Sequence, residues 1–186
     1  MHELDLQWIQ NLSSAMCALK LNSGQNLSGM ASSHVSPAMT VIQLANMRRF
    51  SGNQSHAASI LSSALEHCDS ATSDFSNATH KCTLHHNLGD VLRERQQYDE
   101  CKSQLDRADS CFPANSLNEF EAFLVASPHD RERLLQESDA KRSMFAEIAA
   151  VMATRARLLD NQNSIEDAEK LFNKSLIALR VSVIAT

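Results

Sequence analysis

Residues 82–115, with the sequence CTLHHNLGDVLRERQQYDECKSQLDRADSCFPAN, decide the fold of this chain. Apolar and small side chains recur at helical spacing before and after Gln96-Gln97, which favours two helices joined by a tight turn. Small residues such as Gly89 and Ala108 let the two helices of a pair approach closely. The stretch therefore predicts an antiparallel helix pair that carries Cys82, His85, Leu88, Gly89, Leu92, Cys101, Leu105 and Ala108.

The same spacing recurs on both sides of this stretch. In residues 38–71, Leu44-Ala45 precedes a turn at Ser51-Gly52-Asn53, and Ala57, Leu61 and Ala64 follow it. A third copy covers about residues 146–182, where Met152-Ala153 takes the place of Leu88-Gly89 if the turn is about three residues longer. Its second helix carries Ala168, Phe172 and Leu176. Three pairs are about the number needed for a stable stack, because one pair alone buries too little apolar surface.

We expect residues 1–36 to form a separate N-terminal part, a helix followed by a polar loop. Apolar residues at helical spacing from Glu3 to Leu21 predict one amphipathic helix. Residues 22–36 are rich in Ser, Gly and Asn, which is typical of a loop. Pro37 then opens the repeat domain (37–186), because the missing N–H costs nothing at the first position of a helix. The apolar stripe of the N-terminal helix consists of Trp8, Leu12, Met16 and Leu19.

Two further helices are predicted between the second and third copies. Asn115–Ala126 predicts a short apolar helix around Phe120, Phe123 and Leu124. Ser127-Pro128-His129-Asp130 is typical of a helix start, with serine as the cap, proline at the first position and an acid at the third. We expect the helix that follows to reach Leu159, and Asn161-Gln162-Asn163 to end it before the last helix.

Residues 82–115 resemble the tetratricopeptide repeat, a helix–turn–helix of about 34 residues. The run Thr83–Gly89 resembles the repeats of kinesin light chains most closely. The resemblance implies an all-α fold, an α-solenoid of antiparallel helix pairs whose concave face offers a groove for a segment of a partner protein. The residues that match the repeat pattern are Leu88, Gly89, Tyr98, Leu105, Ala108 and Pro113, with Cys101 as a small substitute.

In that family the first helix of each repeat lines the groove. The register places an arginine at repeat position 12 of all three copies: Arg49, Arg93 and Arg157. Because arginine binds carboxylates through paired hydrogen bonds, this stripe indicates an acidic partner segment. The alternative is that position 12 is simply an exposed position that tolerates charge. The resemblance implies a groove formed by Ile42, Asn46, Arg49, His86, Asn87, Asp90, Arg93, Thr154 and Arg157.

Two more specific binding sites are disfavoured. Chaperone-binding members of the family hold a partner's terminal carboxylate with lysines and asparagines, and Asn46 and Asn87 match, but Ile42 stands at the first lysine position. A zinc site would need four ligands in fixed geometry. We expect Cys82 and His85 to pack in the helix interface, as buried Cys and His often do. No metal and no cofactor are therefore expected.

Catalytic signals are weak throughout the chain. Gly24 and Gly29 have the spacing of a phosphate-binding loop, but Met30-Ala31 follows where lysine and serine or threonine belong. The many Ser, His and Asp residues show no arrangement that marks a nucleophile and its base. We therefore expect no enzymatic activity.

Charge and composition narrow the classes of partner. The net charge is −5 and no block of like charges occurs, which disfavours nucleic-acid binding. No stretch approaches about 18 consecutive apolar residues, so we expect no membrane span. The first five residues lack the layout of a signal peptide. The five cysteines are therefore expected to be reduced thiols in an intracellular, cytoplasmic protein.

These observations favour a non-catalytic scaffold or adaptor that binds a protein or peptide. One alternative is a structural segment of a larger helical-repeat subunit. The last helix, which is apolar on more than one side between Leu176 and Ile184, would then mediate self-association, since a capping helix is polar on its outer side. Another alternative is a regulatory domain of an enzyme whose catalytic part lies elsewhere.

Overall fold

The computed structural model describes residues 37–68, 78–136 and 138–184, and all regular structure in these ranges is helical. The all-α prediction is confirmed for this part of the chain. The predicted helix of residues 3–21 and the loop of residues 22–36 lie outside the described residues. The described helices are α2 (Pro37–Phe50), α3 (Gln54–Cys68), α4 (Ala78–Glu94), α5 (Tyr98–Ser110), α6 (Ser116–Val125), α7 (Pro128–Gln136), α8 (Asp139–Asn161) and α9 (Ile165–Ile184).

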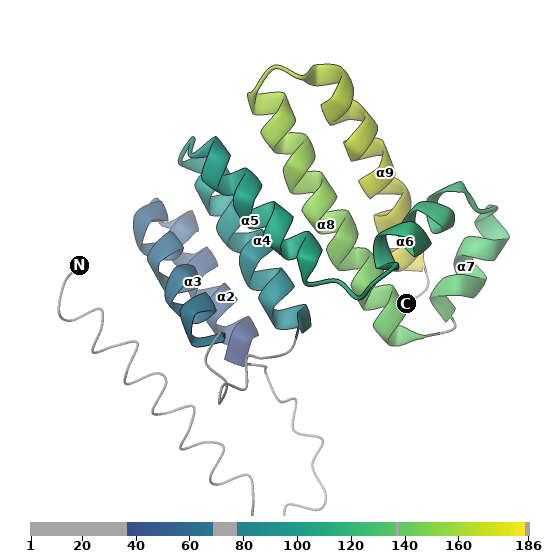
Figure 1. Cartoon of the computed structure of the whole chain (residues 1–186), viewed down its shortest axis with the longest axis horizontal. Coiled ribbons are helices and arrows are strands. Elements are labelled where there is room, and N and C mark those ends of the chain that lie inside the picture. The colour runs from purple at the N-terminus through teal and green to yellow at the C-terminus, as the bar shows by residue number, and fades with distance from the viewer. Residues whose placement is uncertain (1–36, 69–77, 137, 185–186) are drawn as a thin grey trace, which may run out of the picture.

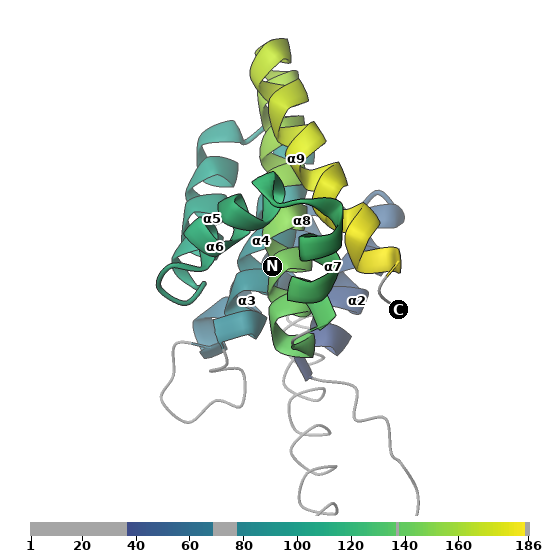
Figure 2. The same ribbon diagram turned by 90° about the vertical axis from the view of Figure 1, so that its right-hand side faces the viewer.

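Three antiparallel hairpins, α2–α3, α4–α5 and α8–α9, stand side by side in chain order (Figure 1). The short helices α6 and α7 follow α5 in the chain and pack against α8 and α9. Seen from the α9 end, α6 and α7 lie in front of α8 and beside α9 (Figure 2). The predicted antiparallel pairs are thus present, with α6 and α7 inserted before the third.

The three hairpins share one turn geometry. Each joins its two helices through three residues, and the middle one has a positive φ: Gly52 at 82°, Gln96 at 61° and Asn163 at 63°. In each turn the N–H of this middle residue donates to the carbonyl three residues earlier, and the next N–H reaches back five residues. These bonds satisfy carbonyls that the helix end would otherwise leave unpaired. We call Gly52, Gln96 and Asn163 the turn residues.

Small side chains occur at fixed separations along the sequence from the turn residues, where the two helices of a hairpin approach each other closely. A Cβ added to Gly89 would lie 3.1 Å from Cδ2 of Leu105, which is closer than side chains normally pack. The prediction that two helices nearly touch at Gly89 is therefore confirmed. Each hairpin has a buried small residue at three sequence positions relative to its turn residue. These lie seven residues before it (Ala45, Gly89, Ala156), five residues after it (Ala57, Cys101, Ala168) and twelve residues after it (Ala64, Ala108, Ser175).

The prediction of a longer third turn is wrong. The third link has three residues, like the other two, and the additional length lies in α8. Counted back from the turn residue, Ala156 matches Gly89, three residues later than predicted. Counted in the same way, the position in α8 that corresponds to Cys82 is Ala149 instead of Ala146. Arg157 therefore shares the register of Asp90 and not that of Arg93.

The prediction of one helix from Ser127 to Leu159 is also wrong. Its start is correct, because the N–H of Asp130 donates to Oγ of Ser127 at 3.2 Å. That helix, α7, ends at Gln136, and Ser138 caps a new helix by accepting a bond from the N–H of Lys141 at 3.4 Å. The break separates the inserted helices from the third hairpin.

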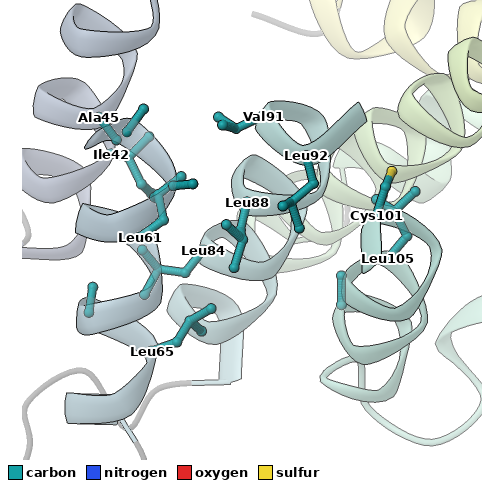
Figure 3. Close-up of a cluster of buried hydrophobic side chains, with 14 of the residues drawn as sticks. Ile42, Ala45, Leu61, Leu65, Leu84, Leu88, Val91, Leu92, Cys101 and Leu105 are labelled. Carbon is teal, nitrogen blue, oxygen red and sulfur yellow. The ribbon is translucent and has the colours of Figure 1, made fainter. Parts of the chain in front are cut away.

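Two clusters of buried side chains hold the helices together. The larger one joins α2, α3, α4 and α5 and extends to Val151 and Leu158 of α8. Figure 3 shows Val91 of α4 directed toward α2 within this cluster. The smaller one centres on three rings: the ring centroid of Phe145 in α8 lies 5.4 Å from that of Phe120 and 5.1 Å from that of Phe123, both in α6. These rings anchor α6 to the third hairpin.

Candidate functional site

Three arginines from three different hairpins gather around the carboxylate of Asp90 in α4. Nη2 of Arg49, in α2, lies 2.7 Å from Oδ2 of Asp90. Nη2 of Arg93, one turn further along α4, lies 2.9 Å from Oδ1. Nη1 of Arg157, in α8, lies 3.8 Å from the same oxygen. The three arginines that sequence spacing placed in one stripe are thus close together in space.

A second carboxylate, that of Glu94, completes this group. Nε of Arg49 donates to Oε2 of Glu94 at 2.8 Å, and Nη2 of Arg49 contacts Oε1. Nη2 of Arg93 lies 3.6 Å from Oε1. We call Arg49, Asp90, Arg93, Glu94 and Arg157 the arginine cluster. Its three guanidinium groups face two carboxylates, which leaves an excess of one positive charge.

The electrostatics of the cluster favour ionised side chains. Burial acts to raise the pKa of the Asp90 carboxyl, but the charges and hydrogen bonds of Arg49 and Arg93 outweigh it, so the pKa lies below its usual value. The hydrogen bond to Glu94 raises the pKa of Arg49 and outweighs the effect of its burial. Asp90 therefore remains a carboxylate, and Arg49 remains charged.

The three arginines differ in how far their side chains are exposed to a partner. The side chains of Arg49 and Arg93 are half-buried and hydrogen-bonded within the cluster. The side chain of Arg157 is 49% exposed, and its contact with Asp90 is the longest of the three. Arg157 therefore presents the most accessible guanidinium of the cluster.

His86 makes a second polar connection between α4 and α8. Its Nε2 lies 3.0 Å from Oγ1 of Thr154, and its Nδ1 lies 3.3 Å from Oε1 of Glu147. The Nδ1 contact becomes an ion pair when the imidazole is protonated. Thr154 is fully buried, so a partner would not touch it directly.

The remaining predicted groove residues do not join the arginine cluster. Ile42 is buried in the core between α2 and its neighbours. Nδ2 of Asn87 donates to the carbonyl of Thr83 in its own helix at 2.8 Å. Asn46 is half-buried on α2. The side chains that a partner could meet on this face are therefore fewer than the sequence implied.

One polar link between hairpins was not singled out from the sequence. Nη2 of Arg155, in α8, lies 2.7 Å from both Oδ1 of Asp106 and Oδ2 of Asp109, in α5. Burial raises the pKa of the Asp109 carboxyl, although Arg155 acts to lower it. The third helix pair was aligned from the sequence by assuming a longer turn, and in that alignment nothing indicated that Arg155 lies beside α5.

The cysteines and histidines of the described ranges do not assemble into a metal-binding group. Within those ranges no three His, Cys, Asp or Glu side chains are grouped so that they could hold a metal ion. Cys82 is buried, and Nδ1 of His85 lies 2.8 Å from Oε1 of Gln104 in α5. Both side chains thus lie in the helix interface, where the sequence placed them.

A search for membrane spans covered the same ranges. None of the helices described there combines the length and the apolar character needed to cross a lipid bilayer.

Comparison of the chain with protein-family models, with curated proteins and with solved structures finds no match.

Proposed function

We propose that this chain is a non-catalytic helical scaffold of the tetratricopeptide type, which binds an acidic segment of another protein. Two features support a repeat of this type. All three hairpins have the same three-residue link with a positive φ at its centre. Small buried residues also stand at the same distances from each turn residue, as close packing of repeated helix pairs requires.

The arginine cluster is the observation that supports an acidic partner. Arg49, Arg93 and Arg157 come from the first helices of three consecutive hairpins, the helices that line the groove in the family. Guanidinium groups bind carboxylates through paired, charge-assisted hydrogen bonds. The excess positive charge of the cluster attracts one further carboxylate, and Arg157 is the side chain best placed to receive it.

The internal carboxylates limit how tightly such a partner binds. Asp90 and Glu94 already occupy Arg49 and Arg93, so an incoming carboxylate must share these donors. Exposed ion pairs contribute only about 0–1 kcal/mol each. The proposal is therefore one of weak, salt-sensitive recognition in which several contacts along the face of α2, α4 and α8 add together.

A fluorescent oligo-glutamate peptide provides a direct test. Anisotropy titrations with the full chain should show binding that weakens as salt rises, because exposed charges are screened over about 8–10 Å. Arg157→Glu should raise the dissociation constant roughly three- to tenfold, since one exposed pair is lost and a repulsion of similar size is added. Arg107→Glu is the matched control, because Arg107 is an exposed arginine on α5, a second helix of its hairpin. Equal losses in both variants would refute the proposed site.

Self-association through α9 is a second candidate function. Leu176 and Leu179 are large apolar residues exposed on this helix. Their counterparts at the same distances from the turn residue in α3 are Leu65 and Cys68, which are buried in the core. Sedimentation velocity over a range of concentrations would test this candidate. Leu176→Glu should abolish any association that α9 mediates, and a parent chain that remains monomeric at all concentrations would exclude it.

A further inference from the structure

Helix α2, at one end of the stack, carries large apolar side chains that no described segment covers. Met39, Met47 and Phe50 are all exposed, and Phe50 is 83% exposed. We call these three residues the outer face of α2. Large apolar side chains exposed along one helix are typical of a surface that another element covers.

The register of the hairpins shows what kind of element belongs there. Met47 stands five residues before its turn residue, and its counterparts in α4 and α8 are Val91 and Leu158. Val91 is 1% exposed and Leu158 5% exposed, and both belong to the core that joins each helix to the preceding hairpin. Met47 is 69% exposed. Met47 therefore lies at the position through which α4 and α8 each receive the preceding hairpin, and Phe50 lies one turn further along the same helix.

We propose that residues 3–21 pack on the outer face of α2 as an antiparallel helix. These residues lie outside the described ranges, and their sequence predicts an amphipathic helix with Trp8, Leu12, Met16 and Leu19 on one side. A helix of this length spans about 28 Å, enough to run along all of α2. The order of helix, link and helix is then the same as for α3 followed by α4.

The length of the link and the charges fit this arrangement. Residues 22–36 can span up to about 50 Å, far more than a return to the start of α2 requires. An antiparallel helix brings Glu3 and Asp5 to the last turn of α2, where Arg48 is exposed. Tethering also gives the segment an effective concentration on the order of millimolar, which favours it over a second chain.

Trp8, the single tryptophan of the chain, makes the proposal directly testable. In the native full-length chain its emission should lie at shorter wavelength than in urea, and acrylamide should quench it several-fold less efficiently. Met47→Glu and Phe50→Glu should each move both signals toward those of the unfolded chain. Val125→Glu is the matched control, because Val125 is as exposed as Phe50 but lies on α6. It should leave both signals unchanged.

Every other outcome overturns the proposal. A native Trp8 as accessible as in urea means that the segment is not packed at all. A shielded Trp8 that is indifferent to Met47→Glu and Phe50→Glu means that it packs elsewhere. Shielding that is lost on dilution, together with a fall in sedimentation coefficient, assigns the outer face of α2 to a second copy of the chain.

Discussion

Nη2 of Arg49 lies 2.7 Å from Oδ2 of Asp90, and this contact joins the first hairpin to the second. The same carboxylate also contacts Arg93 in its own helix and Arg157 in the third hairpin. One buried side chain thus connects all three hairpins. Whether or not a partner binds nearby, Asp90 has a structural role that the sequence stripe of arginines did not reveal.

Asp90→Asn should lower the free energy of unfolding and change its dependence on pH. Near neutral pH we expect a loss of about 1.5–3 kcal/mol, because hydrogen bonds between charged groups are removed. The pKa of Asp90 is lower in the folded chain than the unfolded value of about 3.9. Its stabilisation is therefore fully present above about pH 4 and is lost as the pH falls through the folded pKa. Urea unfolding at several pH values should show a smaller acid-side loss in the variant.

Asp109→Asn is the control for that pH dependence. Burial raises the pKa of Asp109 in the folded chain, so its contribution to stability is present below the unfolded pKa and is lost as the pH rises through the folded value. In this variant the free energy of unfolding should therefore fall in acid by at least as much as it does in the parent chain. If the two variants behave alike in acid, the ion pairs of Asp90 do not govern how the stability of the chain depends on pH.

Arg93→Glu and Arg157→Glu should differ in stability before any partner is added. Reversing Arg93 places a third carboxylate beside Asp90 and Glu94 and removes a half-buried donor, so we expect a cost of about 3–5 kcal/mol. Reversing the exposed Arg157 should cost about 0–1 kcal/mol. Denaturant unfolding of both variants checks this order. Equal costs would mean that the cluster does not hold the hairpins together.

Gly89→Leu should overpack the second hairpin. Its added Cβ would lie 3.1 Å from Cδ2 and 3.3 Å from Cγ of Leu105, so the rest of the introduced leucine side chain has no room. We expect a cost of about 1–3 kcal/mol in urea unfolding. Gly89→Ala should cost less, because Leu105 can shift by a few tenths of an ångström. A leucine variant that unfolds like the parent would contradict the close approach of α4 and α5.

Cys82 and Cys101 should react much more slowly than Cys111 in the folded chain. Burial raises the pKa of Cys101 to about 11 and raises that of Cys82 as well, so little reactive thiolate is present at pH 8. Relative to the unfolded chain we expect alkylation of both to slow by about a hundredfold or more. Half-buried Cys111 should react faster. Timed N-ethylmaleimide labelling with peptide mass spectrometry gives each rate, and rapid native labelling of Cys82 would contradict its burial.

Local sequence signals were sufficient for most helices of the described part. Pro37 and the Ser127-Pro128 pair start helices where their chemistry predicts, since capping and a fixed φ act within a few residues. The break before Ser138 was missed because residues 136–143 contain neither glycine nor proline, and a single serine cap is by itself a weak signal for a new helix. Helix starts are therefore easier to predict than interruptions.

Contacts between hairpins were harder to predict than the hairpins themselves. The arginines were identified from their spacing, but their pairing with Asp90 and Glu94 depends on how adjacent hairpins pack. Thr154 was assigned to an open groove, although it is buried against His86. The corrected register aligns Thr154 with Asn87, which also belonged to the predicted groove, so its burial results from the packing of α8 against α4 and not from the shift in register.

The three turn residues should respond to substitution in a graded order. A side chain at positive φ costs about 1–2 kcal/mol, whereas glycine at the same place costs about 0.5–1 kcal/mol in chain entropy. Gln96→Gly should therefore stabilise the chain by about 0.5–1 kcal/mol, and Asn163→Gly by less, because asparagine tolerates this conformation. Gly52→Ala should destabilise it by about 1 kcal/mol.

Gln97→Gly is the matched control for this series, since Gln97 directly follows a turn residue but has a φ of −91°. Glycine there relieves no strain and adds freedom to the unfolded chain, so we expect a loss of stability. Thermal and urea unfolding of the four variants measures the order. If Asn163→Gly destabilised the chain while Gln96→Gly stabilised it, the third turn would not be equivalent to the second. The register that aligns Arg157 with Asp90 would then lose its basis.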